Sequence, residues 1–137
     1  MKRIFLFAIF SCCAAVFSFA QTPYNVVFDL TSKDTTDHRM VLRWMKDIVA
    51  DYPDARLELV LYGKSLDLVT TGKSFAPAAV KEIVGNKNIR INVCSIAMAR
   101  NHVEEDQLLE GVGTVPDGIY EIISRQADGW GYIKVSH

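Results

Sequence analysis

The chain has 137 residues, of which 50% are hydrophobic and 23% charged, and its 15 Lys and Arg nearly balance its 16 Asp and Glu. This length suits a single domain, and a formal net charge of −1 argues against a general nucleic-acid binder. With only 8 Gly, 4 Pro and 3 Cys, the composition argues against disordered, collagen-like and disulfide-scaffold proteins. We therefore expect a small folded domain that binds no nucleic acid.

The first twenty residues have the pattern of an export signal. Two basic residues precede an apolar run over 4–20, which ends in small residues at Ser18 and Ala20. We expect a Sec-type signal peptide over 1–20, cleaved after Ala20, and a periplasmic or secreted protein with no stable membrane anchor after cleavage. A retained helical anchor is the alternative, since the run is at the lower limit of the roughly 20 residues that span a bilayer. The sequence before Cys12 is also faintly similar to a lipoprotein box.

Cleavage at this point would change both the charge and the cysteine content. Over 21–137 there are 13 basic and 16 acidic residues, a formal net charge of −3. Cys12 and Cys13 would be removed and Cys94 would remain as the one thiol. A single cysteine cannot form a disulfide within the chain. Because cysteines in an oxidising compartment are usually paired, an unpaired Cys94 there suggests a free reactive thiol or pairing with another chain.

Beyond the signal, short apolar runs alternate with amphipathic segments. In chain order, the pattern predicts a strand over 24–30, a helix over 40–52 with caps at 34–36, a strand over 56–62, a helix over 76–84, a strand over 89–94, a short helix over 96–99, a short strand over 112–115, a helix from 117 until Gly129, and a strand over 130–135. The segment 66–71 fits neither pattern. This alternation predicts a single three-layer α/β/α domain over 21–137, with a mainly parallel sheet of about five strands.

Three local features follow from the same pattern. Ser95 is expected to cap the short helix after the third strand, because a serine there can accept a hydrogen bond from a free backbone N–H. In the last helix, Ile119, Ile122 and Ile123 are expected to point inward. His38 is expected on the solvent side of the first long helix.

Cys94 is the candidate reactive residue, because it ends the third predicted strand. In open parallel sheets the functional crevice lies beyond the carboxyl ends of the strands, where helix N-termini also point. A helix terminus stabilises a thiolate by about 0.3 to 1 kcal/mol, less than the roughly 1.4 kcal/mol of one pKa unit. Further support for a thiolate would have to come from Arg100, His102 or Lys64. The alternative is a buried, unreactive cysteine, which is common in folded proteins.

The backbone of the crevice is predicted at Gly63, in the turn after the second strand, and at Ser95. No two candidate metal ligands have a spacing typical of a metal site, since the histidines are at 38, 102 and 137 and the remaining cysteine is at 94. We therefore expect no metal site and no cofactor.

Several segments together resemble the DsrE/DsrF-like family. They are YNVVFDL at 24–30, ELVLYGKSLDLV after 57, INVCSIAM around Cys94, and VPDGIYEIISRQADGWGYIKV up to 135. The resemblance implies a three-layer α/β fold that assembles into homotrimers or homohexamers. It also implies that a cysteine at the end of the third strand carries a persulfide, and Cys94 matches that position.

The expected function is therefore that of an exported sulfurtransferase or sulfur carrier. Cys94 would be persulfide-carrying or redox-active, and would act in sulfur transfer or sulfur metabolism with a sulfur donor or acceptor protein. The alternative is a non-catalytic oligomeric binding module in which the cysteine is structural. Five large apolar residues near element ends belong either to the core or to a subunit interface: Phe75, Leu108, Leu109, Trp130 and Tyr132.

Overall fold

The computed structural model describes residues 22–137. The predicted signal peptide, its cleavage site after Ala20, and the cysteines at 12 and 13 lie outside the described residues. The region 22–137 contains every predicted strand and helix of the α/β pattern.

Five strands and four α-helices alternate along residues 22–137, with two short 3-10 helices between them. They are β1 (Asn25–Leu30), α1 (Thr35–Asp51), β2 (Arg56–Leu61), a 3-10 helix (Leu66–Val69), α2 (Pro77–Val84), β3 (Ile89–Cys94), α3 (Ser95–Asn101), a 3-10 helix (Glu105–Gln107), β4 (Gly113–Val115), α4 (Gly118–Ala127) and β5 (Gly131–Lys134). The bounds of β3 are those predicted, and each other predicted strand and helix overlaps an observed one.

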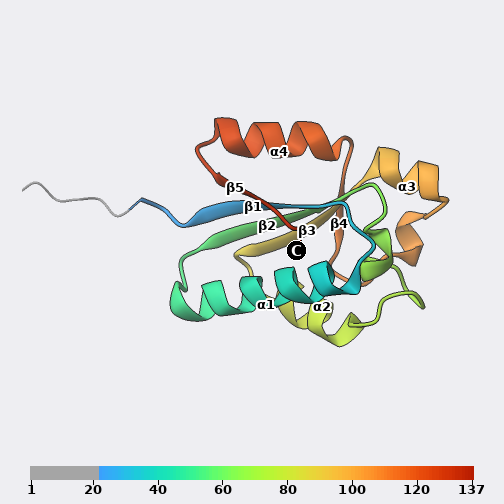
Figure 1. The fold of residues 1–137 in the computed structure, drawn as a ribbon, viewed down its shortest axis with the longest axis horizontal. Coiled ribbons are helices and arrows are strands. Elements are labelled where there is room, and N and C mark those ends of the chain that lie inside the picture. The colour runs from blue at the N-terminus through green and yellow to red at the C-terminus, as the bar shows by residue number, and fades with distance from the viewer. Residues whose placement is uncertain (1–21) are drawn as a thin grey trace, which may run out of the picture.

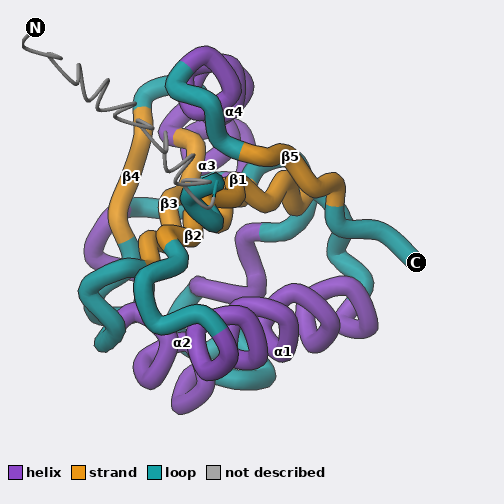
Figure 2. The backbone as a smooth tube through the Cα atoms, turned by 90° about the vertical axis from the view of Figure 1, so that its left-hand side faces the viewer, coloured by secondary structure: helices purple, strands orange, loops and turns teal. Residues whose placement is uncertain are grey.

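The strands form one sheet in the order β4-β3-β2-β1-β5, and every neighbouring pair is parallel. Helices α1 and α2 lie on one side of this sheet and α4 lies on the other (Figure 1). Figure 2 shows the same layers from the side, with the strands between α4 and the α1/α2 pair. The predicted three-layer α/β/α domain with a mainly parallel sheet is therefore confirmed.

The sheet face toward α1 and α2 is apolar throughout its three central strands. Alternate residues of β1, β2 and β3 lie on it, none more than 5% exposed: Val26, Phe28, Leu30, Leu57, Leu59, Leu61, Ile89, Ile91 and Val93. Helix α1 adds Val41 and Met45 to this core, and α2 adds Val80. Burying each large apolar side chain stabilises the fold by about 1.5–3 kcal/mol, so this face supplies most of the folding free energy.

Helix α1 begins and ends where its sequence provides the signals. An Asp34 carboxylate oxygen accepts a hydrogen bond from the Thr36 backbone N–H at 2.7 Å, which satisfies one free donor of the first turn. The Tyr52 N–H closes the last turn on the Ile48 carbonyl, directly before Pro53. The prediction for His38 was wrong, because its ring is only 1% exposed and its Nε2 lies 2.7 Å from the Ser32 carbonyl oxygen. The ring also stacks on Phe75, so the loop before α2 covers it.

The face toward α4 has a smaller apolar cluster and several polar side chains. Val27, Val60 and Ile122 are buried together there, but Glu58, in the middle of β2, is fully buried on the same face. Arg125 of α4 forms an ion pair with this carboxylate.

This ion pair turns one side of α4 toward the sheet. That side carries Gly118, Ile122 and Arg125, which are four and three residues apart and therefore lie on one face of the helix. The expectation that Ile119 and Ile123 point inward was wrong, since they are 57% and 56% exposed. Within residues 22–137, no helix is both long and apolar enough to cross a membrane.

Candidate functional site

Cys94 lies at the carboxyl end of the sheet, on the face that α4 covers. It is the last residue of β3, and the first turn of α3 follows it directly. The residue is 5% exposed and forms no disulfide. The predicted placement of this cysteine at a strand end is therefore confirmed by the structure.

A cavity of about 400 Å³ opens beside Cys94. Its walls come from the loop after β2, from α3 and from the start of α4: Tyr62, Gly63, Cys94, Ile96, Ala97, Arg100, Asn101, Asp117 and Ile119. Apolar side chains line most of it, while Arg100 provides a cation and Asp117 a carboxylate. A volume of this size holds a small molecule or the end of a side chain from another protein.

Of the predicted supporting residues, the structure brings Arg100 and Gly63 to this cavity. Lys64, Ser95 and His102 do not line it. Lys64 and His102 are exposed, and His102 ends α3 in a left-handed conformation with φ of 54°.

Ser95 is not the cap of α3. The capping position is occupied by Cys94, and Ser95 is the first residue of the helix, with no side-chain cap hydrogen bond. The reason is that β3 continues into α3 without a loop, so the cysteine itself is the residue of non-helical conformation before the helix.

The wall between α3 and the β2 loop is fixed by Asn101. Its Nδ2 donates hydrogen bonds to the Gly63 carbonyl at 3.1 Å and to the Ala97 carbonyl at 2.7 Å. Gly63 has φ of +66°, and a Cβ there would lie 3.3 Å from the Thr31 carbonyl oxygen. A glycine is therefore required at this turn for both conformational and steric reasons.

The start of α4 packs directly on Cys94. Asp117 caps this helix by accepting hydrogen bonds from the Ile119 and Tyr120 backbone N–H groups. A Cβ on Gly118 would lie 3.0 Å from Cys94 Cβ and 3.6 Å from a ring carbon of Tyr62. The absence of a side chain at Gly118 thus lets α4 approach the cysteine and brings Tyr62 to the same place.

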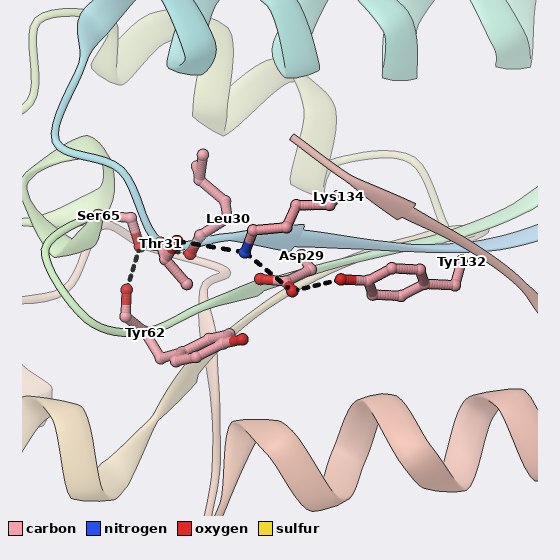
Figure 3. A network of polar contacts seen from close by, with 7 residues as sticks. All are labelled: Asp29, Leu30, Thr31, Tyr62, Ser65, Tyr132 and Lys134. Atoms are coloured by element: carbon pink, nitrogen blue, oxygen red, sulfur yellow. Dashed lines mark hydrogen bonds and ion pairs between the residues drawn. The ribbon is translucent and has the colours of Figure 1, made fainter. Parts of the chain in front are cut away.

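Behind Tyr62 lies a network of polar side chains at the ends of β1 and β5 (Figure 3). Asp29 is 4% exposed, and its Oδ2 accepts hydrogen bonds from the Tyr132 hydroxyl at 2.7 Å and from Lys134 Nζ at 3.3 Å. Lys134 also donates to Thr31 Oγ1 at 3.4 Å. In this view the end of the Tyr62 side chain lies beside the Asp29 carboxylate, whose Oδ1 has no hydrogen-bond partner.

Both tyrosines of this network hold their protons tightly. Burial, and then the neighbouring Asp29 charge, raise the pKa of Tyr62 to about 12. For Tyr132, the hydrogen bond to Asp29 and then burial raise the pKa to about 12. At neutral pH both side chains are therefore neutral hydrogen-bond donors.

Sequence reasoning did not identify Tyr62, Asp117 or Asp29 as parts of the site. A signal for Asp29 is present, since an acidic residue between Phe28 and Leu30 in an apolar strand marks a buried polar position. Tyr62 and Asp117 come together with Cys94 only through the sheet order, which the sequence alone does not give.

No group of three or more metal-ligating side chains is found among residues 22–137. A larger depression, of about 960 Å³, lies at the opposite end of the strands and adjoins the first described residues. It is lined in part by Tyr52, Pro53 and Trp130 and contains neither cysteine nor histidine. We therefore place the candidate site at the smaller cavity, which is lined by Cys94, the single thiol among residues 22–137.

A family model matches almost all of the described residues. The model of the DsrE/DsrF-like family matches residues 25–135, which is nearly the whole described region. The chain belongs to the DsrE/DsrF-like family. The resemblance to this family, which was inferred from four sequence segments between 24 and 135, is thereby confirmed.

Solved structures with the same fold agree with the family match. The protein of unknown function MTH1491 from Methanobacterium thermoautotrophicum is 30% identical, with a TM-score of 0.76, over 81% of this chain and 98% of its own. The ychN protein from E. coli is 13% identical, with a TM-score of 0.68, over 82% of this chain and 98% of its own. The conserved protein of unknown function BT1422 from Bacteroides thetaiotaomicron is 15% identical, with a TM-score of 0.68, over 82% of this chain and 95% of its own. No curated protein matched significantly.

Proposed function

We propose that this DsrE-like protein is a sulfur carrier in which Cys94 accepts sulfane sulfur as a persulfide and passes it to an acceptor thiol. The observation that carries the proposal is the position of Cys94, the single thiol of residues 22–137, in the wall of a cavity at the carboxyl end of a parallel sheet. Family membership supports it, because the family suggests a sulfur-relay-type fold.

The transfer consists of two thiol exchanges. The Cys94 thiolate attacks the terminal sulfur of a donor persulfide, so that a new S–S bond forms on Cys94, the donor S–S bond breaks, and the donor leaves as a thiolate. An acceptor thiolate then attacks the terminal sulfur on Cys94, and the Cys94 thiolate is regenerated. No electrons are gained or lost overall, so the cycle requires no cofactor.

The surroundings of Cys94 suit the storage of one sulfur atom. Ile96, Ala97 and Ile119 make much of the cavity wall apolar, which keeps water from a reactive terminal sulfur. Arg100 lies at the same cavity and can attract an anionic persulfide. Because the cysteine is only 5% exposed, we expect donors that present sulfur on a narrow group or as a small polysulfide.

Mass spectrometry of the intact full-length chain tests this proposal. Incubation with polysulfide, thiosulfate or a persulfidated donor protein should add one sulfur atom, and a reductant should remove it. The chain is tested in a Cys12→Ser/Cys13→Ser background, where it should still gain one sulfur atom, whereas the same background with Cys94→Ser should gain none. A chain that stays unmodified with every donor would contradict the proposal.

A non-catalytic oligomeric binding module is the second candidate, and the exposed side of α4 favours it. Tyr120, Ile119 and Ile123 are 69%, 57% and 56% exposed, and Ile96, at 44%, lies at the same cavity as Ile119. Such a patch suits an interface. Binding to a partner that persists in Cys94→Ser would favour this function over sulfur transfer.

We also propose that this patch is buried in a homotrimer or homohexamer. Of the five apolar residues predicted as core or interface, Leu108, Leu109 and Trp130 pack against the core, while Phe75 and Tyr132 are 40% and 41% exposed. Light scattering should give a trimeric or hexameric mass that falls in an Ile119→Asp/Ile123→Asp variant. A strictly monomeric parent protein would contradict this.

Export to the periplasm or the medium is proposed from residues 1–20. Sequencing of the amino terminus of the protein from cells should show a start at Gln21. An intact Met1 in a cytosolic fraction would contradict it.

A further inference from the structure

Helix α4 meets the sheet at both of its ends. At its start, a Cβ added to Gly118 would lie 3.0 Å from Cys94 Cβ and 3.6 Å from a ring carbon of Tyr62. Near its other end, Arg125 forms an ion pair with Glu58, which is fully buried in β2. In Figure 1 the helix runs from the end of the sheet where α3 lies to the end where β5 begins. The contact with Cys94 and the ion pair are therefore at opposite ends of one helix.

The spacing of these contacts on the helix is close to their spacing on the strand. From Gly118 to Arg125 the helix rises by about 10 Å. The part of β2 and its following loop that lies beneath, from Glu58 to Tyr62, spans about 13 Å. Because neither span can stretch, both contacts form together only at one position of the helix along the strand.

The apolar contacts beneath α4 are few. Ile122 is the buried apolar side chain of this helix, and it packs with Val27 and Val60. Apolar contacts of this kind are not directional, whereas a charge-assisted hydrogen bond fixes both distance and direction. The position of α4 along β2 therefore depends on the ion pair more than on apolar packing.

Both partners of the ion pair are also held by other groups. Glu58 accepts a hydrogen bond from Asn92 Nδ2 on β3 at 2.8 Å. Arg125 pairs with Glu121 at 2.9 Å, and its guanidinium lies 5.0 Å from the centroid of the Trp130 ring. The Arg125 side chain is only 18% exposed. A pair with so little freedom can hold the helix at a single position.

We propose that Glu58 and Arg125 are a positioning pair that fixes how closely the start of α4 approaches Cys94. Neither residue lines the Cys94 cavity, so the pair acts only through the helix. The start of α4 contributes Asp117 and Ile119 to the cavity wall, and the pair thereby determines the width of the entrance. If the proposed function holds, the pair excludes bulky sulfur donors from the thiol and admits small polysulfides.

Alkylation of Cys94 by a small and a bulky reagent tests the pair without any sulfur donor. In the full-length chain with Cys12→Ser and Cys13→Ser, Cys94 is the one remaining thiol. Iodoacetamide should enter the cavity of this parent protein, whereas a dye-linked maleimide should react far more slowly. The ratio of the two rates measures the width of the entrance.

The informative variant is Glu58→Met/Arg125→Met, which removes both charges together and keeps side chains of similar length. Folded proteins often tolerate such an exchange of a buried ion pair. The maleimide rate should rise by at least about 10-fold, because the helix is no longer held at one position. The iodoacetamide rate should change by less than about 3-fold, since this small reagent already fits the parent cavity.

Two single variants extend the test. Glu58→Gln keeps the shape of the side chain and removes its charge, so the maleimide rate should rise by roughly 2- to 10-fold. This variant gives the same test if the double variant does not fold. Arg125→Lys should keep the parent's ratio of rates, because the arginine contacts Glu58 through Nε and a lysine Nζ reaches nearly the same place.

Phe28→Ala is the matched stability control, because it weakens the opposite face of the sheet and leaves the ion pair in place. Alkylation through global unfolding increases with urea, whereas a shifted α4 admits the maleimide equally at zero and at low urea. Phe28→Ala should therefore keep the parent's ratio of rates without urea.

An unchanged ratio in the folded double variant, or an equal rise in Phe28→Ala, would overturn the positioning pair. Because neither reagent carries sulfane sulfur, this result is independent of the proposed function. A protein that never gains sulfur but shows the rise would refute sulfur transfer alone. A protein that gains sulfur without showing the rise would refute the positioning pair alone.

Discussion

The two faces of the sheet are built differently, although the same strands supply both. Toward α1 and α2, successive inward positions of β1 read Val26, Phe28 and Leu30. Toward α4, the intervening positions include Val27 and Asp29. One face therefore supplies stability, while the other combines a smaller apolar cluster with the buried polar groups that lie behind the Cys94 cavity.

The largest effect should come from breaking the apolar face. Phe28 is fully buried there, and Phe28→Ala should lower the free energy of unfolding by about 3–5 kcal/mol, through lost burial and the cavity left behind. Urea unfolding measures this change. A loss below about 1 kcal/mol would mean that the core does not depend on this face.

On the α4 face, the equivalent weak point is an ion pair. Arg125→Ala would leave the fully buried Glu58 carboxylate with only the 2.8 Å hydrogen bond from Asn92, at a cost of about 3 kcal/mol. Lys81→Ala is the control, because it breaks the exposed Lys81–Glu110 pair, and should cost less than about 1 kcal/mol. Equal losses in the two variants would show that burial of Glu58 is irrelevant.

Gly118 is where α4 packs most closely on the site. A Cβ there would lie 3.0 Å from Cys94 Cβ and 3.1 Å from Val60 Cγ1, so Gly118→Ala should destabilise the protein by about 1–3 kcal/mol and alter Cys94 alkylation. At Gly131 the closest atom is 3.6 Å away, so Gly131→Ala should change stability by less than about 0.5 kcal/mol. Thermal unfolding of the two variants side by side decides this. An unaffected Gly118→Ala would show that α4 can move away from the cysteine without cost.

The smallest expected effect is a pH dependence on the alkaline side. The folded pKa of Tyr132 is about 12 and its ordinary value is 10.0, so the unfolded chain loses this proton first as pH rises. The associated stability is complete below pH 10 and is lost as pH approaches about 12. Tyr132→Phe should therefore flatten the decline of the urea midpoint in this window. An equally steep decline in the variant would assign it to other groups.

The parts of the fold that were predicted from sequence are those in which local pattern and burial agree. Residues 89–94 alternate apolar and polar side chains and form β3 with those bounds. Ile119 and Ile123 were misplaced because the sequence does not show that Arg125 must reach Glu58, which rotates α4. His38 was misplaced because the covering residue, Phe75, comes from a distant loop.

The candidate site was predictable only in part, for the same reason. Cys94 and Gly63 carry local signals, a strand end and a turn glycine. Tyr62, Asp117 and Asn101 reach the cavity from three separate segments that the sheet order brings together. Lys64 and His102 are close to the site in sequence, but their side chains are not in the cavity wall.

The central claim, that Cys94 carries sulfur, is tested most directly by weighing the full-length protein after exposure to polysulfide. In a Cys12→Ser/Cys13→Ser background, we predict a gain of one sulfur atom that localises to the Cys94 peptide, is reversed by a reductant, and is absent when Cys94→Ser is added. The absence of any such gain with every donor, in a folded protein whose Cys94 still reacts with iodoacetamide, would contradict the account.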